Sequence, residues 1–171
     1  MGLMPFGVQR GLPADFLLRW TCHYEKPYSH GTSPRDIEGV PSAATHVFVG
    51  AQSPDGTIAL GAIGSREAVL RRTEGEATHE DNGVHWYFAF DEYGEGLSFG
   101  FSRTAAVDLS AADTLGSGHS SHAADEDGHY RLSWHLDADE GGWRAGQVIN
   151  LTSDHRDDAD DWKKLLYWIA L

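Results

Sequence analysis

The segment 84-VHWYFAFDEYGEGLSFGFS-102 decides the fold class of this chain. Both of its ends alternate apolar with polar or small residues, and successive side chains on a β-strand point to opposite faces. Its acidic, Gly-containing centre is typical of a turn. The segment therefore predicts a β-hairpin. Alternate positions supply aromatic and aliphatic side chains suited to a core: Trp86, Phe88, Phe90, Leu97, Phe99 and Phe101.

The same pattern occurs in 46-HVFVGAQSPDGTIALGAIG-64 and in 129-HYRLSWHLDADEGGWRAGQVINL-151. Three hairpins in a chain of 171 residues predict an all-β fold. The expected architecture is an antiparallel β-sandwich of two sheets, with about eight to ten strands. We expect residues 1–171 to form one such domain, because a chain of this length builds a single hydrophobic core.

The segments around the hairpins are less regular. We expect residues 1–15 to be an irregular leader, 16–26 to hold a first strand and 27–45, with three Pro, to be a long surface loop. Residues 68–70 are expected to finish a strand. Residues 110–128, rich in His, Asp and Ser, are expected to form an exposed loop.

The C-terminal segment supports two interpretations. Trp162, Leu165, Leu166 and Ile169 are spaced as on one face of a helix, and a short helix within 154–166 would be the single helix of the domain. The run from Leu165 to Leu171 is equally apolar at odd and even positions, as in a buried central strand. We favour the strand because the rest of the chain is β-rich.

Charge and cysteine content limit the functional classes. The formal net charge of −13 disfavours nucleic acid and anionic membranes as partners. No long apolar run or signal-peptide pattern is visible, and Cys22 is the single cysteine. We therefore expect a cytoplasmic protein, with secretion after processing left open. A homo-oligomer is also expected.

The sequence assigns no catalytic residue. Cys22 and His23 are adjacent, and neighbouring side chains on a strand point to opposite faces, so they are poorly placed as a nucleophile and its base. The chain contains no Gly-x-Ser-x-Gly motif and no phosphate-binding loop. We therefore favour a protein that binds without catalysing a reaction.

A histidine-rich segment provides the main alternative. Imidazole and carboxylate groups are ligands for zinc and related ions. The closely spaced candidates are His119, His122, Asp125 and His129. A divalent-metal-dependent enzyme using His119, His122 and His129 is therefore the second functional hypothesis, and that metal is the single cofactor considered. A flexible polar loop is the simpler interpretation.

The acidic turn 137-DADEGG-142 begins like a calcium loop, but Val148 stands where an EF-hand has its bidentate Glu. An acidic hairpin turn is therefore favoured. A looser calcium site with Asp154 or Asp157 stays open.

Aromatic residues near turns suggest the leading function. Tyr24, Tyr28, Tyr93 and Trp143 lie in or beside expected loops, where a ring can stack on an apolar ligand face while neighbouring polar groups form hydrogen bonds. This favours a non-enzymatic, lectin-like module for a carbohydrate or another small polar ligand. The expected contacts come mainly from the third hairpin: Trp143, Arg144, Asp137, Asp139 and Tyr93. The competing structural interpretation is that Trp143 packs against Trp134 in the core.

A third hypothesis is a membrane-acting β-sandwich toxin. Its insertion segment would use apolar residues near the start of the chain: Phe6, Leu12, Phe16, Leu17 and Trp20. The net charge and the lack of an unbroken amphipathic pattern argue against this function.

Replacement of His119, His122 and His129 by Ala tests the metalloenzyme hypothesis. A Ser-, Ala- and Gly-rich loop holds ligands poorly, so we expect the triple variant to fold and function almost as the wild type does. Metal analysis of both purified proteins is the measurement. Stoichiometric zinc in the wild type, lost in the triple variant, would favour the metalloenzyme instead.

Overall fold

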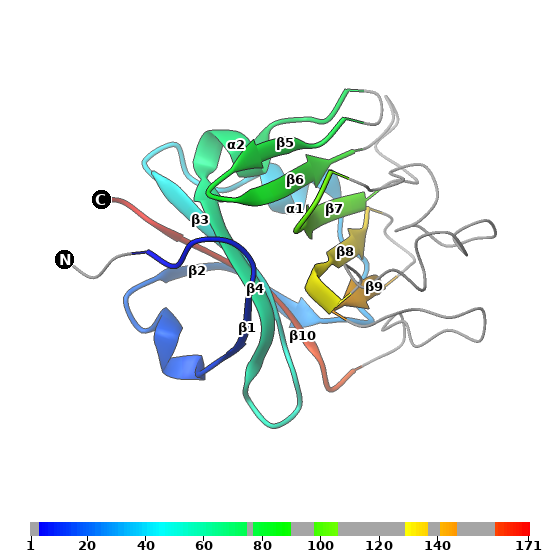
Figure 1. Ribbon diagram of the computed structural model, residues 1–171. Coiled ribbons are helices and arrows are strands. Elements are labelled where there is room, and N and C mark those ends of the chain that lie inside the picture. Colours follow the sequence, from blue (N-terminus) through cyan, green and yellow to red (C-terminus); the bar gives the residue numbers. More distant parts are fainter. Residues whose placement is uncertain (1–3, 75–76, 90–97, 106–128, 137–140, 147–159) are drawn as a thin grey trace.

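The computed structural model describes residues 4–74, 77–89, 98–105, 129–136, 141–146 and 160–171, apart from the Trp143 side chain. It contains two antiparallel sheets of five strands each, which form two layers (Figure 1). The first sheet has the order β1 (Gln9–Leu12), β4 (Ile58–Ser65), β3 (His46–Gln52), β10 (Lys163–Ile169) and β2 (Thr21–Pro27). The second has the order β5 (His79–Asp81), β6 (Val84–Phe88), β7 (Ser98–Ser102), β8 (Leu132–His135) and β9 (Gly142–Ala145). The predicted two-sheet, all-β architecture is confirmed.

The C-terminal strand completes the first sheet. After the second sheet the chain returns, and β10 enters between β3 and β2, where Leu166 lies opposite Val49 on one side and Tyr24 on the other. Leu165 and Leu166 are both buried, each in a different hydrophobic cluster. Such two-sided burial is what a central strand requires. The strand interpretation of this segment is therefore confirmed.

The aromatic rows of the second hairpin pair across its two strands. Trp86 pairs with Phe101, and Phe88 pairs with Phe99. In both pairs the ring centroids lie 5.4 Å apart and the rings meet edge to face. This geometry is favourable for aromatic rings, and all four side chains lie in the main core. Phe90 and Leu97, also predicted for this core, lie outside the described residues.

The N-terminal segment is not an irregular leader as predicted. Within it β1 pairs with β4, and the side-chain amide of Asn82 donates to the carbonyl groups of Pro5 (2.9 Å) and Ile63 (3.0 Å). Asn82 and Gly83 have φ of 54° and 70°, as in the two-residue turns that favour Asn-Gly. One hairpin turn therefore ties the start of the chain to both sheets.

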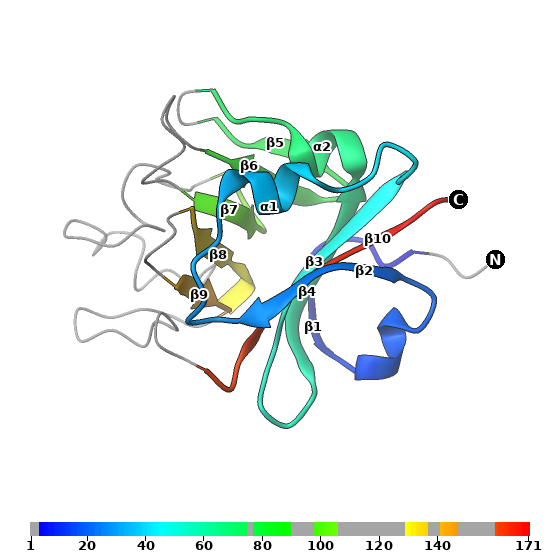
Figure 2. The same cartoon turned by 180° about the vertical axis from the view of Figure 1, so that it is seen from behind.

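Two short helices differ from the predictions. The expected loop 27–45 contains α1 (Pro34–Glu38), where the Ser33 amide and hydroxyl donate to the Asp36 carboxylate in a capping box. Residues 68–70, predicted as strand, belong to α2 (Arg66–Leu70). Both helices lie at the same end of the sheets (Figure 2). The one helix that the sequence allows within 154–166 is absent from residues 160–166, and residues 154–159 lie outside the described part of the chain.

A second hydrophobic cluster covers the outer face of the first sheet. Its buried members are Leu17, Phe48, Ile58, Ile63 and Leu165. Leu12, Phe16 and Trp20 pack against it. Phe16 and Leu17, predicted to begin a strand over residues 16–26, belong to the short helix η1 (Ala14–Leu17) instead. Four of the five proposed membrane-insertion side chains thus have a packing role, whereas Phe6 is 74% exposed.

Tyr28 connects the two sheets at the end of β2. Its amide donates to the Trp162 carbonyl (2.8 Å), and its carbonyl accepts from the Gly142 amide (2.5 Å). Its hydroxyl donates to the Arg144 carbonyl (3.0 Å) and accepts from the Trp134 indole (3.1 Å). The side chain is fully buried. The interpretation of Tyr28 as an exposed loop aromatic is therefore wrong.

A buried lysine lies beside this tyrosine. Lys164 donates to the Thr32 hydroxyl (2.7 Å) and to the His30 carbonyl, and its ammonium lies 6.0 Å from the centre of the Tyr28 ring. Tyr24, hydrogen-bonded to the same Thr32, is also buried, and burial raises its pKa to about 12. Tyr24 thus lies in the strand expected within 16–26, and its ring belongs to the core and not to an exposed ligand site.

Two substitutions test the connection through Tyr28. Tyr28→Phe leaves a buried carbonyl and a buried indole N–H without their shared partner, which costs about 1–3 kcal/mol of unfolding free energy. Gly142→Ala places a methyl group 2.3 Å from a Tyr28 ring carbon and should be at least as destabilising. Urea denaturation measures both.

Tyr167→Phe is the matched control, because the Tyr167 hydroxyl donates to Glu25 at the exposed face of the first sheet. This loss should cost less than about 1 kcal/mol. Equal losses for Tyr28→Phe and Tyr167→Phe would contradict the role assigned to Tyr28.

Candidate functional site

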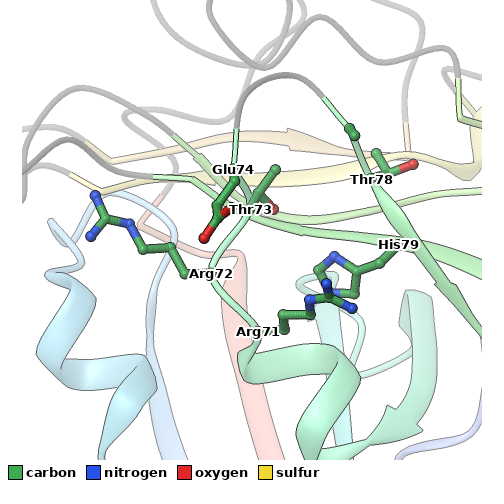
Figure 3. Close-up of a pocket in the computed structure, with 7 residues that line it drawn as sticks. Arg71, Arg72, Thr73, Glu74, Thr78 and His79 are labelled. Atoms are coloured by element: carbon green, nitrogen blue, oxygen red, sulfur yellow. The ribbon is translucent and has the colours of Figure 1, made fainter.

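A polar pocket lies where the chain passes from α2 to β5 (Figure 3). Its volume is about 420 Å³. The lining comes from two short segments that face each other across it: Arg71, Arg72, Thr73 and Glu74 on one side, and Ala77, Thr78 and His79 on the other. The pocket therefore sits at the edge of the second sheet formed by β5.

His79 forms part of the pocket wall. Its Nε2 is hydrogen-bonded to the Ala68 carbonyl, and because a carbonyl only accepts, the proton of the neutral ring lies on Nε2. Burial lowers the pKa of His79, and the nearby Arg71 charge lowers it further, while the Ala68 carbonyl and Asp81 act in the opposite direction. His79 is therefore neutral near pH 7, with Nδ1 as an acceptor.

The two threonines fix the pocket to the second sheet. Thr73 accepts from the Phe88 amide through its hydroxyl (2.9 Å), and its own amide donates to the Phe88 carbonyl (2.8 Å). The Thr78 hydroxyl lies 3.1 Å from His85 Nδ1. Since Phe88 and His85 both belong to β6, both sides of the pocket are anchored on the same strand.

The charged side chains are arranged unequally around the pocket. Arg71 and His79 line the same pocket, and the Arg71 charge acts on the imidazole, whereas Arg72 points away from His79 in Figure 3. Glu74 lies on the side opposite His79. The pocket thus combines a cation and a neutral imidazole at one end with a carboxylate at the other.

A second group of polar residues covers the outer face of the second sheet. Its members are fully or almost fully buried: Tyr87, Ser98, Ser102, Arg131, Ser133, His135 and Arg144. Tyr87 reaches across Gly100, which has no side chain, to the Ser133 hydroxyl and donates to the Leu132 carbonyl (2.6 Å). Arg131 and Arg144 have further interactions, as buried guanidinium groups require. This face is therefore an internal polar layer.

Of the predicted ligand contacts, Arg144 and the backbone of Trp143 lie on β9, at the edge of the second sheet opposite β5. Arg144 is described and is fully buried opposite Ser133. Trp143 is the extra residue at a register shift in β9, but its side chain is outside the described part of the structure. Asp137, Asp139 and Tyr93 also lie outside the described residues, so a ligand site at this hairpin stays a prediction.

The predicted metal ligands are not tested. His129 is described and exposed, while His119, His122 and Asp125 lie outside the described residues, as do most residues of the acidic turn. Within the described ranges, no group of three His, Cys, Asp or Glu side chains is placed to hold a metal ion.

The cysteine is located on β2. Cys22 is exposed, and the Nε2 of its neighbour His23 is hydrogen-bonded to the Asp36 carbonyl (2.8 Å). The His23 ring therefore forms a hydrogen bond with the backbone of α1 and not with Cys22.

The pocket residues were not recognised in the sequence. The segment 65-SREAVLRRTEGEATHEDNG-83 shows a mixture of charges, and the helix within it was interpreted as a strand. With residues 68–70 helical, the chain leaves α2 at Arg71 and returns along β5, so that Arg71 and His79 line the same pocket. The available signal was Ser65, which caps this helix by accepting from the Ala68 amide (3.2 Å).

Comparisons of the chain with protein-family models, with curated proteins and with solved structures found no significant match. Over the described ranges, no helix is long and apolar enough to cross a membrane. The pocket geometry is therefore the main basis for a functional argument.

The lowered pKa of His79 predicts a pH dependence of stability. The unfolded chain binds a proton at His79 more tightly than the folded chain does, so this residue reduces stability as the pH falls below its ordinary value of 6.5. His79→Gln should reduce the loss of unfolding free energy between about pH 7.5 and about pH 5. His46→Gln, at a half-buried position on β3, is the control. Identical pH profiles for His79→Gln and the wild type would contradict this effect.

Proposed function

We propose that the protein is a non-enzymatic, lectin-like module that binds a carbohydrate or another small polar ligand in the pocket beside β5. The single observation that carries this proposal is a pocket of about 420 Å³ lined almost entirely by hydrogen-bonding side chains. Small-ligand sites commonly have volumes of about 300–1,000 Å³.

The chemistry of the lining suits a polyhydroxylated ligand. Sugar hydroxyl groups both donate and accept hydrogen bonds, and the pocket supplies both kinds of partner. Arg71 donates, Glu74 and the Nδ1 of His79 accept, and the Thr78 hydroxyl can do either. The pocket lining holds no thiol, because Cys22 lies on the other sheet.

Preorganisation supports the same proposal. Thr73 and Thr78 hold the two sides of the pocket on β6, which lies within the second sheet. A site whose walls are already ordered loses little conformational entropy when a ligand binds. The pocket is therefore suited to a small ligand that makes few contacts.

A homo-oligomer in the cytoplasm belongs to the same proposal. Several copies of a weak site raise the avidity for a ligand that carries repeated groups. Light scattering of the purified protein measures the number of subunits.

A glycan array tests the proposed function. We expect the wild type to bind a defined set of glycans, and Arg71→Gln or Thr78→Val to lose most of that binding, because each removes a pocket hydrogen-bonding group. Arg19→Gln, at an exposed position outside the pocket, makes the same charge change and should bind normally. Melting temperatures confirm that the variants remain folded.

The array also separates the pocket from the third hairpin. Binding that is unchanged in Arg71→Gln and Thr78→Val but is lost in Trp143→Ala, or in Asp137→Ala with Asp139→Ala, would place the site at the hairpin instead. No glycan binding by the wild type would contradict the carbohydrate class.

A further inference from the structure

We propose that the pocket recognises an oxyanion on its ligand, a carboxylate or a phosphate, between the Arg71 guanidinium and His79, and that binding transfers a proton from solvent to His79. This inference rests on the proposed ligand-binding function of the same pocket. It adds the charge of the ligand and the dependence of binding on pH.

The first argument is the position of Arg71. It lines the same pocket as His79, and its charge acts on the imidazole (Figure 3). A guanidinium presents several N–H donors in one plane and matches carboxylate and phosphate oxygens. A neutral ligand would use this group only as an ordinary hydrogen-bond donor.

The second argument is the fixed tautomer of His79. Nε2 donates to the Ala68 carbonyl, so a second proton binds at Nδ1. Within the described part of the chain, Nδ1 forms no hydrogen bond. A protonated Nδ1 becomes a second donor next to Arg71. The two groups can then contact two oxygens of one anion, with the Thr78 hydroxyl as a neighbouring donor.

The charges around His79 explain why the anion and the proton arrive together. Burial and the Arg71 charge oppose protonation of His79, while the Ala68 carbonyl and Asp81 favour it. Glu74 faces His79 from the opposite side, and His85 is hydrogen-bonded to Thr78. An oxyanion beside Arg71 compensates its charge and stabilises the imidazolium. Binding of the anion and protonation of His79 are therefore thermodynamically linked.

Glu74 limits the choice of ligand. Its carboxylate lies opposite His79 and would repel a second anionic group at that end of the pocket. It remains an acceptor for hydroxyl groups. The geometry thus favours a ligand with one anionic end and one hydroxylated end, such as a sugar acid or a sugar phosphate.

Isothermal titration calorimetry with three probes tests the inference: glucuronic acid, glucose 6-phosphate and glucose. We expect at least one charged probe to bind at least about tenfold more tightly than glucose, because the charged contacts are stronger than neutral ones. A carboxylate-specific or a phosphate-specific site is distinguished by which probe binds better. Affinity for glucuronic acid should rise about tenfold from about pH 7.5 to about pH 5.5.

Variants assign the effect to the two residues. Titration in two buffers of different ionisation enthalpy should show proton uptake by the wild type and none by His79→Gln, whose amide can still donate to the Ala68 carbonyl. Arg71→Gln should remove the preference for charged probes, while Arg19→Gln should keep it.

The outcomes separate this inference from the proposed function. Equal affinity for all three sugars, with proton uptake absent, would overturn the inference and leave a neutral-sugar pocket. Failure of both charged probes to bind would overturn the inference, and the glycan array would then decide the function independently. Proton uptake that persists in His79→Gln would also contradict the assignment to His79.

Discussion

The fold depends on the hydrogen bonds by which Tyr28 joins the two sheets. Its backbone forms hydrogen bonds with Trp162, which directly precedes β10 of the first sheet, and with Gly142 of the second sheet. Its hydroxyl forms hydrogen bonds with Arg144 and Trp134. Two sheets joined only by apolar packing can slide, because the hydrophobic effect has no direction. Directed hydrogen bonds to a buried ring fix their relative position. Gly142 is required at this point, since any side chain there would overlap the Tyr28 ring.

The position of the candidate pocket depends on the second sheet, which Tyr28 holds against the first sheet. The second sheet is a simple meander with β5 at one edge and β9 at the other. Tyr28 fixes the β9 edge, and the pocket occupies the β5 edge, where Thr73 and Thr78 are bonded to β6. A rigid sheet edge holds the backbone of both pocket sides in place, which suits recognition of a ligand.

The alternation of apolar and polar side chains in the sequence predicted the β-strands, in which side chains repeat every two residues. The pairing of Trp86 with Phe101 and the central position of β10 follow from apolar side chains at regular positions. The capped helices α1 and α2 were missed because each spans five residues, too few for a helical period to appear. Tyr28 was misplaced because its partners are more than a hundred residues away in the chain. The pocket was missed for the same reason as α2, whose turn brings Arg71 to His79.

The most direct test of the account is a nuclear magnetic resonance titration of the isotope-labelled protein with glucuronic acid, which locates binding residue by residue. The account predicts that amide shifts concentrate at residues 71–74 and 77–79 and at the adjoining positions of β6, with the His79 imidazole signals moving towards the protonated form. Strands β9 and β10 should show little change. Shifts concentrated at Gly142–Ala145, with none around His79, would contradict the assignment of the pocket as the ligand site.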